Sequence, residues 1–518
     1  MRIGLLLTLT LPAMLYGAAP SPWATPAELR ALSFKARHEN VRHLDFSPCG
    51  TRLVTTGGNQ VMLWDCKVGK LLARHSKGLV FTRHGVHTGD GKRIAVLAAS
   101  AGSFCVKVYD ATNLDLLGEV GLGKVFLHEM ASIPGTSRVV VARKNGLAIV
   151  DVQALRIARE IRFDDDFSPR YPKVSPDGSQ LVCGHGDHTP PDLRTVVRWI
   201  DLNTGKKVRD WRTSVLDKGM APTPSVSAFS PSEGLFAVGK DCDDLVTLCD
   251  PARPDLMRRF NWNRRLYKDE EPHPNRGVAN LCFAPDGKTL MVISFDRFMR
   301  SWETATGQLR YKSTMQCDNM ALSPDGRILA TSDQLAGVVR LWNWRDLGSH
   351  QLAATEADLP DLWRRLGSTN GVVAYRGVTA LIAAPREAVA LLKKQIRRTE
   401  PVEAALLARL TNDLGSEEFA VRDAAEKALN GHGRVAESAL RKLLESKPTP
   451  EARRRAERLL RPLDALSTQE VRDLRAVEVL EAVATPEALA LLRHWAEGAN
   501  GTTLTRHARA ARDRLNTR

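Results

Sequence analysis

A tight turn recurs along the first two thirds of the chain, with an apolar strand-like segment on each side. Its clearest copy is Ser323-Pro324-Asp325-Gly326, in which proline fixes φ and glycine supplies a left-handed position. Counted by their glycines, the turns fall at positions 50, 91, 135, 178, 234, 287 and 326. A second marker follows each turn in step, from Leu63-Trp64-Asp65 to Leu341-Trp342-Asn343. Two independent markers therefore predict seven repeated units.

The spacing of these units favours one architecture. Successive turn glycines lie 39 to 56 residues apart, and a four-stranded propeller blade usually takes about 40 to 45 residues. Within each unit apolar and polar residues alternate, as half-buried strands require. The sequence therefore predicts an all-β seven-bladed propeller over residues 29–347, followed by a second domain.

The repeats resemble WD40 β-propellers in number and in the order of their markers. In that family a His, a Ser or Thr, an Asp in the following turn and a Trp form a hydrogen-bonded set that stiffens each blade. The resemblance implies this role, complete or in part, for His38, Thr55, Asn59, Trp64, His273, Ser294, Asp296, Trp302 and Trp342. The remaining blades match less well, so we expect them to be less rigid.

The ends of the repeat region predict how the ring closes. Six units have a fourth strand after the Trp-Asp marker, but the seventh unit has none. The segment Leu29–Ala36 is a strand without a unit of its own. A propeller that leaves no open edge usually shares one blade between the two ends of the chain. We therefore expect Leu29–Ala36 to be the outer strand of blade seven.

After a linker at residues 348–358, the apolar period changes to about 3.6 residues, which predicts an all-α domain over residues 359–518. Thr449-Pro450-Glu451 and Thr485-Pro486-Glu487 are typical helix starts, and Ser467 with Glu470 matches a capping box. Residues 416–444 are similar to a HEAT-like repeat, with Arg422-Asp423 where such repeats stack. A propeller followed by such helices resembles a recurrent class of exported bacterial WD40 proteins.

The first residues favour export. Arg2 precedes the apolar run Ile3–Tyr16, which small residues follow, and this order is typical of a secretory signal peptide at residues 1–19. A buried N-terminal strand or helix is the alternative. Residues 20–28 are then a linker, and no later stretch is apolar enough to span a membrane. We expect a periplasmic, extracellular or envelope location.

The net charge of +15 does not indicate nucleic acid, because both signs are interspersed along the chain. We instead expect a protein partner. Loops on propeller faces are frequent binding sites, and two places are candidate contacts, although ordinary surface is the alternative for both. They are the inserted loop with Trp262, Arg264, Arg265 and Tyr267, and the basic helix face with Arg454 and Arg458.

No sequence pattern predicts catalysis, a cofactor or a metal. His185-Gly186-Asp187-His188 lacks further ligands in a defined set, and Asp164-Asp165-Asp166 lacks the spacing of a calcium loop. The preferred function is a non-catalytic protein interaction scaffold, because both domains are repeats that build extended surfaces. The alternatives are an enzyme with its site in the channel or at the junction of the domains, and a structural protein of the envelope. Convergent carboxylates or His in the channel would favour the enzyme, and small apolar groups the scaffold.

Overall fold

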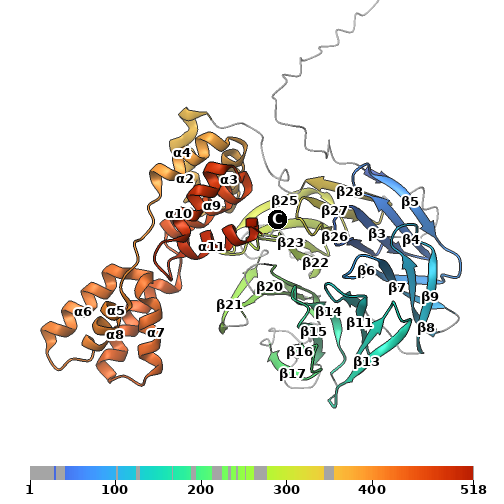
Figure 1. Ribbon diagram of the computed structural model, residues 1–518, viewed down its shortest axis with the longest axis horizontal. Coiled ribbons are helices and arrows are strands. Elements are labelled where there is room, and N and C mark those ends of the chain that lie inside the picture. The colour runs from blue at the N-terminus through green and yellow to red at the C-terminus, as the bar shows by residue number, and fades with distance from the viewer. Residues whose placement is uncertain are drawn as a thin grey trace, which may run out of the picture.

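The computed structural model describes residues 28–30, 41–100, 103–123, 129–165, 167–187, 194–212, 224–231, 235–240, 243–250, 253–261, 277–335, 337–343 and 355–516. These residues form a propeller ring with a helical domain beside one part of it (Figure 1). The predicted order of an all-β domain and an all-α domain is confirmed.

The described strands form seven antiparallel sheets of four strands, one sheet per blade. Blades one to three are β2 His43–Phe46, β3 Arg52–Gly57, β4 Gln60–Asp65 and β5 Lys70–His75; β6 Phe81–His87, β7 Arg93–Ser100, β8 Ser103–Asp110 and β9 Leu116–Gly123; and β10 Met130–Ser132, β11 Arg138–Arg143, β12 Gly146–Asp151 and β13 Arg156–Arg162. Blades four and five are β14 Arg170–Val174, β15 Gln180–Asp187, β16 Arg194–Asp201 and β17 Lys207–Arg212; and β18 Pro224–Phe229, β19 Phe236–Lys240, β20 Asp243–Asp250 and β21 Arg253–Asn261. Blade six is β22 Val278–Phe283, β23 Thr289–Ser294, β24 Phe298–Glu303 and β25 Leu309–Gln316, and blade seven combines β26 Asn319–Leu322, β27 Ile328–Asp333 and β28 Val338–Asn343 with β1 Glu28–Arg30.

The ring closes through its first strand. β1 pairs antiparallel with β28, and Leu29 lies opposite Val339. This pairing involves the beginning of the segment expected to close the ring, while residues 31–40 lie outside the described residues. One apolar cluster joins blade seven to blade one, with Ile328 and Leu341 packed together with residues such as Leu53. The shared blade therefore leaves β28 without an open edge.

The recurring turn has the backbone that its sequence predicts. Six of the turn glycines have φ between 66° and 74°, a region that residues with a Cβ rarely adopt. Those glycines are Gly50, Gly91, Gly135, Gly178, Gly287 and Gly326. The acidic residues of the second marker also hold turns, since the Asp65 carboxylate accepts from the Lys67 backbone N–H at 2.7 Å. These carboxylates serve the fold, as expected.

The first strands of the blades surround the central channel. Each first strand contacts the first strand of the next blade, and β26 contacts β2. Side chains also connect neighbouring blades there, since the Asn319 amide donates to the Val41 carbonyl at 3.2 Å. The apolar cores lie between adjacent sheets, so the ring is packed from blade to blade.

The first α-helix of the helical domain begins at Leu359. Its helices are α2 Leu359–Leu366, α3 Gly371–Ala383, α4 Pro385–Gln395, α5 Ala404–Asp413, α6 Phe419–His432, α7 Glu437–Glu445, α8 Pro450–Leu460, α9 Thr468–Val483, α10 Pro486–Ala496 and α11 Thr503–Asn516, with short 3-10 turns η2 Glu356–Asp358, η3 Gly433–Ala436 and η4 Arg461–Asp464. The predicted capping box of Ser467 and Glu470 is present at α9, and Thr449 and Thr485 cap α8 and α10.

The helices form two lobes with separate cores. Helices α2 to α4 and α9 to α11 share one apolar cluster around Trp495, and α5 to α8 share another around Leu440. The first lobe lies beside the propeller and the second lies farther away (Figure 1). We call them the inner lobe and the outer lobe. The segment similar to a HEAT repeat supplies α6 and α7 of the outer lobe.

Candidate functional site

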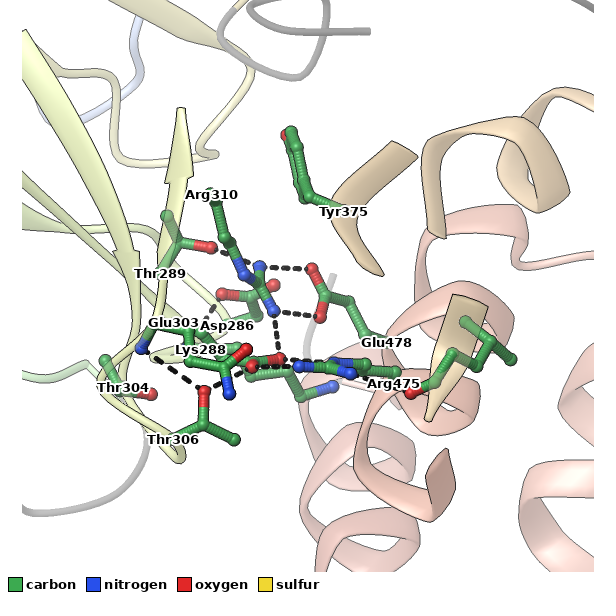
Figure 2. Close-up of polar contacts among 12 residues, drawn as sticks. Asp286, Lys288, Thr289, Glu303, Thr304, Thr306, Arg310, Tyr375, Arg475 and Glu478 are labelled. Atoms are coloured by element: carbon green, nitrogen blue, oxygen red, sulfur yellow. Dashed lines mark hydrogen bonds and ion pairs between the residues drawn. The ribbon is translucent and has the colours of Figure 1, made fainter. Parts of the chain in front are cut away.

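The inner lobe meets blade six through a buried cluster of charged side chains (Figure 2). The propeller contributes Lys288, Glu303 and Arg310, and helix α9 contributes Arg475, Glu478 and Glu481, with Arg514 of α11 completing the set. We call these seven residues the junction cluster. Six of the seven, all except Arg514, are buried.

Glu303 lies at the centre of the junction cluster. It ends β24 and is therefore the acidic residue of the second sequence marker in blade six. Its carboxylate accepts from the Arg310 guanidinium at 2.8 Å and from two nitrogens of Arg475 at 2.9 and 2.7 Å. Burial alone would raise the pKa of Glu303, but the charges and hydrogen bonds of both guanidinium groups lower this pKa to about 2. Glu303 is therefore an anion at all ordinary pH values.

Arg310 connects the two domains directly. Its guanidinium donates to both carboxylate oxygens of Glu478 at 2.7 Å, which is the bidentate geometry that binds carboxylates best. The same group donates to the Thr289 hydroxyl at 2.7 Å and lies 5.3 Å from the centre of the Tyr375 ring. Burial opposes the charged form, but Glu478 and Glu303 raise the pKa of Arg310 well above its usual value.

A second part of the junction cluster lies beside the first. The Glu481 carboxylate accepts from the Lys288 ammonium at 3.0 Å and from two nitrogens of Arg514 at 2.7 Å. Burial would raise the pKa of Glu481, but the two cations lower it to about 2. Every carboxylate in the junction cluster therefore faces at least one cation at hydrogen-bond distance.

Helix α9 presents these charges because of their spacing. Arg475, Glu478 and Glu481 follow one another at intervals of three residues, so they share one helix face. Apolar residues of the same helix, Val477 and Leu480 among them, join the inner-lobe core. The helix is thus buried on both faces, and the sequence period alone did not indicate that its charged face is covered.

Arg475 also holds the end of another helix. Its guanidinium donates to the backbone carbonyls of Leu366 and Ser368 at 2.7 and 2.9 Å. These carbonyls lie at and just beyond the C-terminus of α2, where a cation compensates unpaired carbonyl groups. One side chain therefore ties blade six, α2 and α9 together.

The central channel also contains titratable groups, and their arrangement differs from that of the junction cluster. The rings of His43 and His84 lie 3.5 Å apart between their centres, and His43 Nδ1 lies 2.9 Å from the Gly85 carbonyl oxygen. Burial lowers the pKa of His43 to about 4 and that of His84 well below its usual value. Burial also raises the pKa of Glu129 to about 7.

The lining therefore differs from the small apolar channel expected for a simple scaffold. The contact between two buried His side chains is a feature that the sequence analysis associates with an enzyme. In the part of the chain that the structure describes, however, no group of three or more His, Cys, Asp or Glu residues is arranged to hold a metal. Seven cysteines with described positions are free thiols.

The predicted blade networks are present in part. Trp64 Nε1 donates to the Thr55 hydroxyl at 3.1 Å, and Trp342 Nε1 donates to the Thr331 hydroxyl at 2.9 Å. Asn59 lies in the turn between β3 and β4. The predicted residues His38 and His273 lie outside the described residues, so their role stays a prediction.

Blade six departs from the predicted network because of its register. Leu290 lies opposite Trp302 in blade six, as Leu53 lies opposite Trp64 in blade one. Val292 therefore occupies the position that Thr55 holds in blade one, and the alignment of Ser294 with Thr55 was two residues out of register. The Ser294 hydroxyl accepts from Arg300 at 3.1 Å and hydrogen-bonds to the Asp296 carboxylate.

Arg300 also organises the turn after Ser294. Its guanidinium donates to both carboxylate oxygens of Asp296 at 3.0 and 2.5 Å. Asp296 accepts from the Phe298 backbone N–H at 3.0 Å. Asp296 thus holds the turn between β23 and β24 with an arginine that the family pattern did not indicate.

The candidate partner contacts are placed only in part. The loop with Trp262, Arg264, Arg265 and Tyr267 lies outside the described residues. On α8, Arg458 is paired with Glu426 at 3.0 Å, and Arg454 is exposed. Neighbouring Arg455 is occupied by Glu426 and Glu451. The basic face of α8 is therefore partly neutralised within the outer lobe.

Comparison with known proteins agrees with the resemblance of the repeats to WD40 propellers. The family described as WD domain, G-beta repeat matches residues 31–65, which include most of blade one. Together with the seven sheets, this match defines a WD40-type seven-bladed propeller followed by a helical region.

Two proteins are similar to part of the chain. The chain is 22% identical over 319 residues to apoptotic protease-activating factor 1 of Mus musculus, which covers 60% of this chain and 23% of that protein. The chain thus spans about a quarter of that relative's length. A solved chain of Kuenenia stuttgartiensis hydrazine synthase is similar with a TM-score of 0.51 and 17% identity, covering 61% of this chain and 98% of that one. This second similarity shows the fold alone.

Proposed function

We propose that the protein is a non-catalytic interaction scaffold in which propeller and inner lobe act as one rigid unit. The junction cluster is the observation that carries this proposal. Its side chains connect residues as far apart as Glu303 and Arg475, 172 positions along the chain. A scaffold that orients two binding surfaces needs such a fixed angle between its domains.

The contacts around the junction cluster favour rigidity over catalysis. The carboxylates of Glu303 and Glu481 have their pKa lowered to about 2, whereas a general acid or base works best with a pKa near the operating pH. The charged groups are also buried against partners that already use their hydrogen bonds. The arrangement can hold the domains but has no free group for proton transfer.

An enzyme remains the second candidate because of the channel. Glu129, whose pKa is raised to about 7, has the proton affinity of a general base and lies in the same channel as His43 and His84. The paired charges of the junction cluster, by contrast, directly support a fixed arrangement of the two domains, so the scaffold is the better supported function.

A partner surface on the exposed side of the molecule is part of this proposal. The loop with Trp262 and the α8 face with Arg454 and Arg458 are the candidate contacts. In the described residues, no helix has the length and apolar character needed to cross a membrane. Export, with residues 1–19 as signal peptide, is proposed from the sequence alone. The alternative function of an exported chain is that of a structural protein associated with the cell envelope. N-terminal sequencing of the native protein tests export, and an intact Met1 would contradict it.

The scaffold proposal is tested by affinity capture with a matched pair of variants. Glu478→Gln removes the carboxylate charge that Arg310 needs and loosens the domains, whereas Glu497→Gln changes an exposed carboxylate that pairs with Arg398 at 3.1 Å. We expect the wild-type chain and Glu497→Gln to retain the same protein in constant ratio, and Glu478→Gln to lose it. Retention by all three chains would contradict a role for the fixed angle, and no retained protein would contradict the scaffold.

A further inference from the structure

The channel holds a lysine that is placed near the ring axis. Lys173 lies on β14, the first strand of blade four, and its side chain is half-buried. The positive charge of Lys173 contributes to the pKa shifts of His43 in blade one, His84 in blade two and Glu129, which directly precedes β10 of blade three. It also acts on Cys282 in blade six. Only a side chain that reaches into the channel is close to four other blades at once.

The described carboxyl groups near this lysine do not form an ion pair with it. Among the described residues, no carboxylate lies at ion-pair distance from the Lys173 ammonium. Asp45 is engaged elsewhere, because its carboxylate accepts from the His87 backbone N–H at 2.7 Å and contacts the His87 ring at 3.2 Å. Glu129 makes no ion pair with Lys173 in the described residues. A half-buried ammonium without an ion-pair partner can bind an added anion through charge-assisted hydrogen bonds.

The neighbouring groups add to this positive character. Arg83 lies on β6, and its charge acts on His84 and Glu129 as that of Lys173 does. His43 and His84 are in contact with each other and lie within range of the Lys173 charge, but a neutral imidazole does not cancel that charge. His84 Nδ1 is also buried without a hydrogen-bond partner in the described part of the chain. A channel lined in this way attracts anions and concentrates them.

We infer that the central channel binds a small oxyanion, a carboxylate or a phosphate group, with Lys173 as its main contact and Arg83 beside it. The site is independent of the junction cluster and of the scaffold proposal. It differs from the candidate partner contacts because its ligand is a small anion held inside the ring. The two histidines form the polar wall next to the anion.

Isothermal titration calorimetry of the full chain with inorganic phosphate, and separately with acetate, tests this site. We expect saturable binding that Lys173→Met weakens about tenfold or more, because a hydrogen bond to a charged group is lost. Lys207→Met is the matched control, since Lys207 lies on the outer strand of the same blade and is exposed. Sodium chloride at equal ionic strength controls for screening. Phosphate binding without acetate binding assigns a phosphate site, and the reverse assigns a carboxylate site.

Two results would overturn the inference. They are the absence of saturable binding of either anion, and equal binding by the wild-type chain and Lys173→Met. Lys173→Arg covers the case in which Lys173→Met does not fold, because it keeps the positive charge and should retain binding. If the folded Lys173→Arg chain binds neither anion, the inference fails.

A second variant tests the site by removing a negative charge instead of a positive one. Glu129 becomes an anion above its pKa of about 7 and then repels a bound anion. Glu129→Gln should therefore strengthen phosphate binding above that pH and leave it little changed below. The charged groups that act on the Glu129 carboxyl are Lys173 and Arg83. Weaker binding by Glu129→Gln above the pKa would contradict the site.

Discussion

The junction cluster and the channel both place charged groups away from water, but they treat those groups in opposite ways. At the junction each carboxylate meets cations at hydrogen-bond distance, as Glu303 meets Arg310 and Arg475. In the channel, Lys173 and Glu129 have no such partners in the described residues. Paired charges hold two parts of a structure together, whereas unpaired charges are available to a ligand. The comparison separates a structural site from a binding site within one molecule.

The difference is also visible in the directions of the pKa shifts. At the junction, partners overcome burial and lower the pKa of Glu303 and Glu481 to about 2. In the channel, burial prevails, raises the pKa of Glu129 and lowers that of His43. Burial without a partner disfavours the charged form, and burial with one preserves it.

Removing one cation from the junction should have the largest effect. Arg310→Met leaves Glu478 buried without the guanidinium that it binds through both oxygens. Loss of one member of a buried ion pair costs about 3–5 kcal/mol. We expect the free energy of unfolding to fall by that amount in denaturant titrations. Arg398→Met is the control, since its pairs are exposed and worth at most about 1 kcal/mol. Equal losses in the two variants would contradict the special status of the junction.

Acid should loosen the junction only at low pH. The pKa of Glu303 and Glu481 is depressed from 4.5 to about 2, so the unfolded chain binds protons first as the pH falls. The stability contributed by these groups is therefore complete above about pH 4.5 and is lost as the pH falls towards 2. The expected loss is several kcal/mol, since each pKa unit corresponds to about 1.4 kcal/mol.

The channel histidines give an earlier acid response. The pKa of His43 is lowered from 6.5 to about 4, so its contribution to stability is lost as the pH falls between those values. Glu129 acts in the opposite direction between 4.5 and about 7, because the folded state holds its proton more tightly. The free energy of unfolding should therefore fall more steeply with decreasing pH in Glu129→Gln than in the wild type between about pH 6.5 and 4.5. An identical profile would show that the channel groups do not titrate as described.

Local signals of the sequence predicted most of the fold. Recurring turn glycines such as Gly326 and cap residues such as Ser467 act on backbone within a few positions, so their pattern can be read directly. The ring and the start of the helices followed from these signals. The marker residue Glu303 was correctly assigned to the fold, although its partners were not foreseen.

The sites could not be predicted in the same way because they depend on distant pairs. Glu303 and Arg475 are 172 residues apart, and no spacing rule connects them. Lys173 is one lysine among many in a basic chain, and only the ring brings it near four other blades. The register of Ser294 failed for a related reason, because the turn between β23 and β24 has one residue more than the turn between β3 and β4, and such a change moves side chains to other partners.

The smallest expected effect concerns the helix that covers blade six. A Cβ on Gly371 at the start of α3 would lie 2.4 Å from the Leu309 carbonyl oxygen in β25. Backbone atoms move only at a high energetic cost. Gly371→Ala should therefore push α3 away from the outer strand and lower the free energy of unfolding by about 1–3 kcal/mol. Gly431 in α6 has open space around its Cβ position, so Gly431→Ala should instead stabilise the chain by about 0.4–1 kcal/mol. Denaturant titration of both variants measures the contrast. A stabilising Gly371→Ala would mean that α3 does not rest on β25 in solution, and the covered edge of blade six would have to be reconsidered together with the rigid unit.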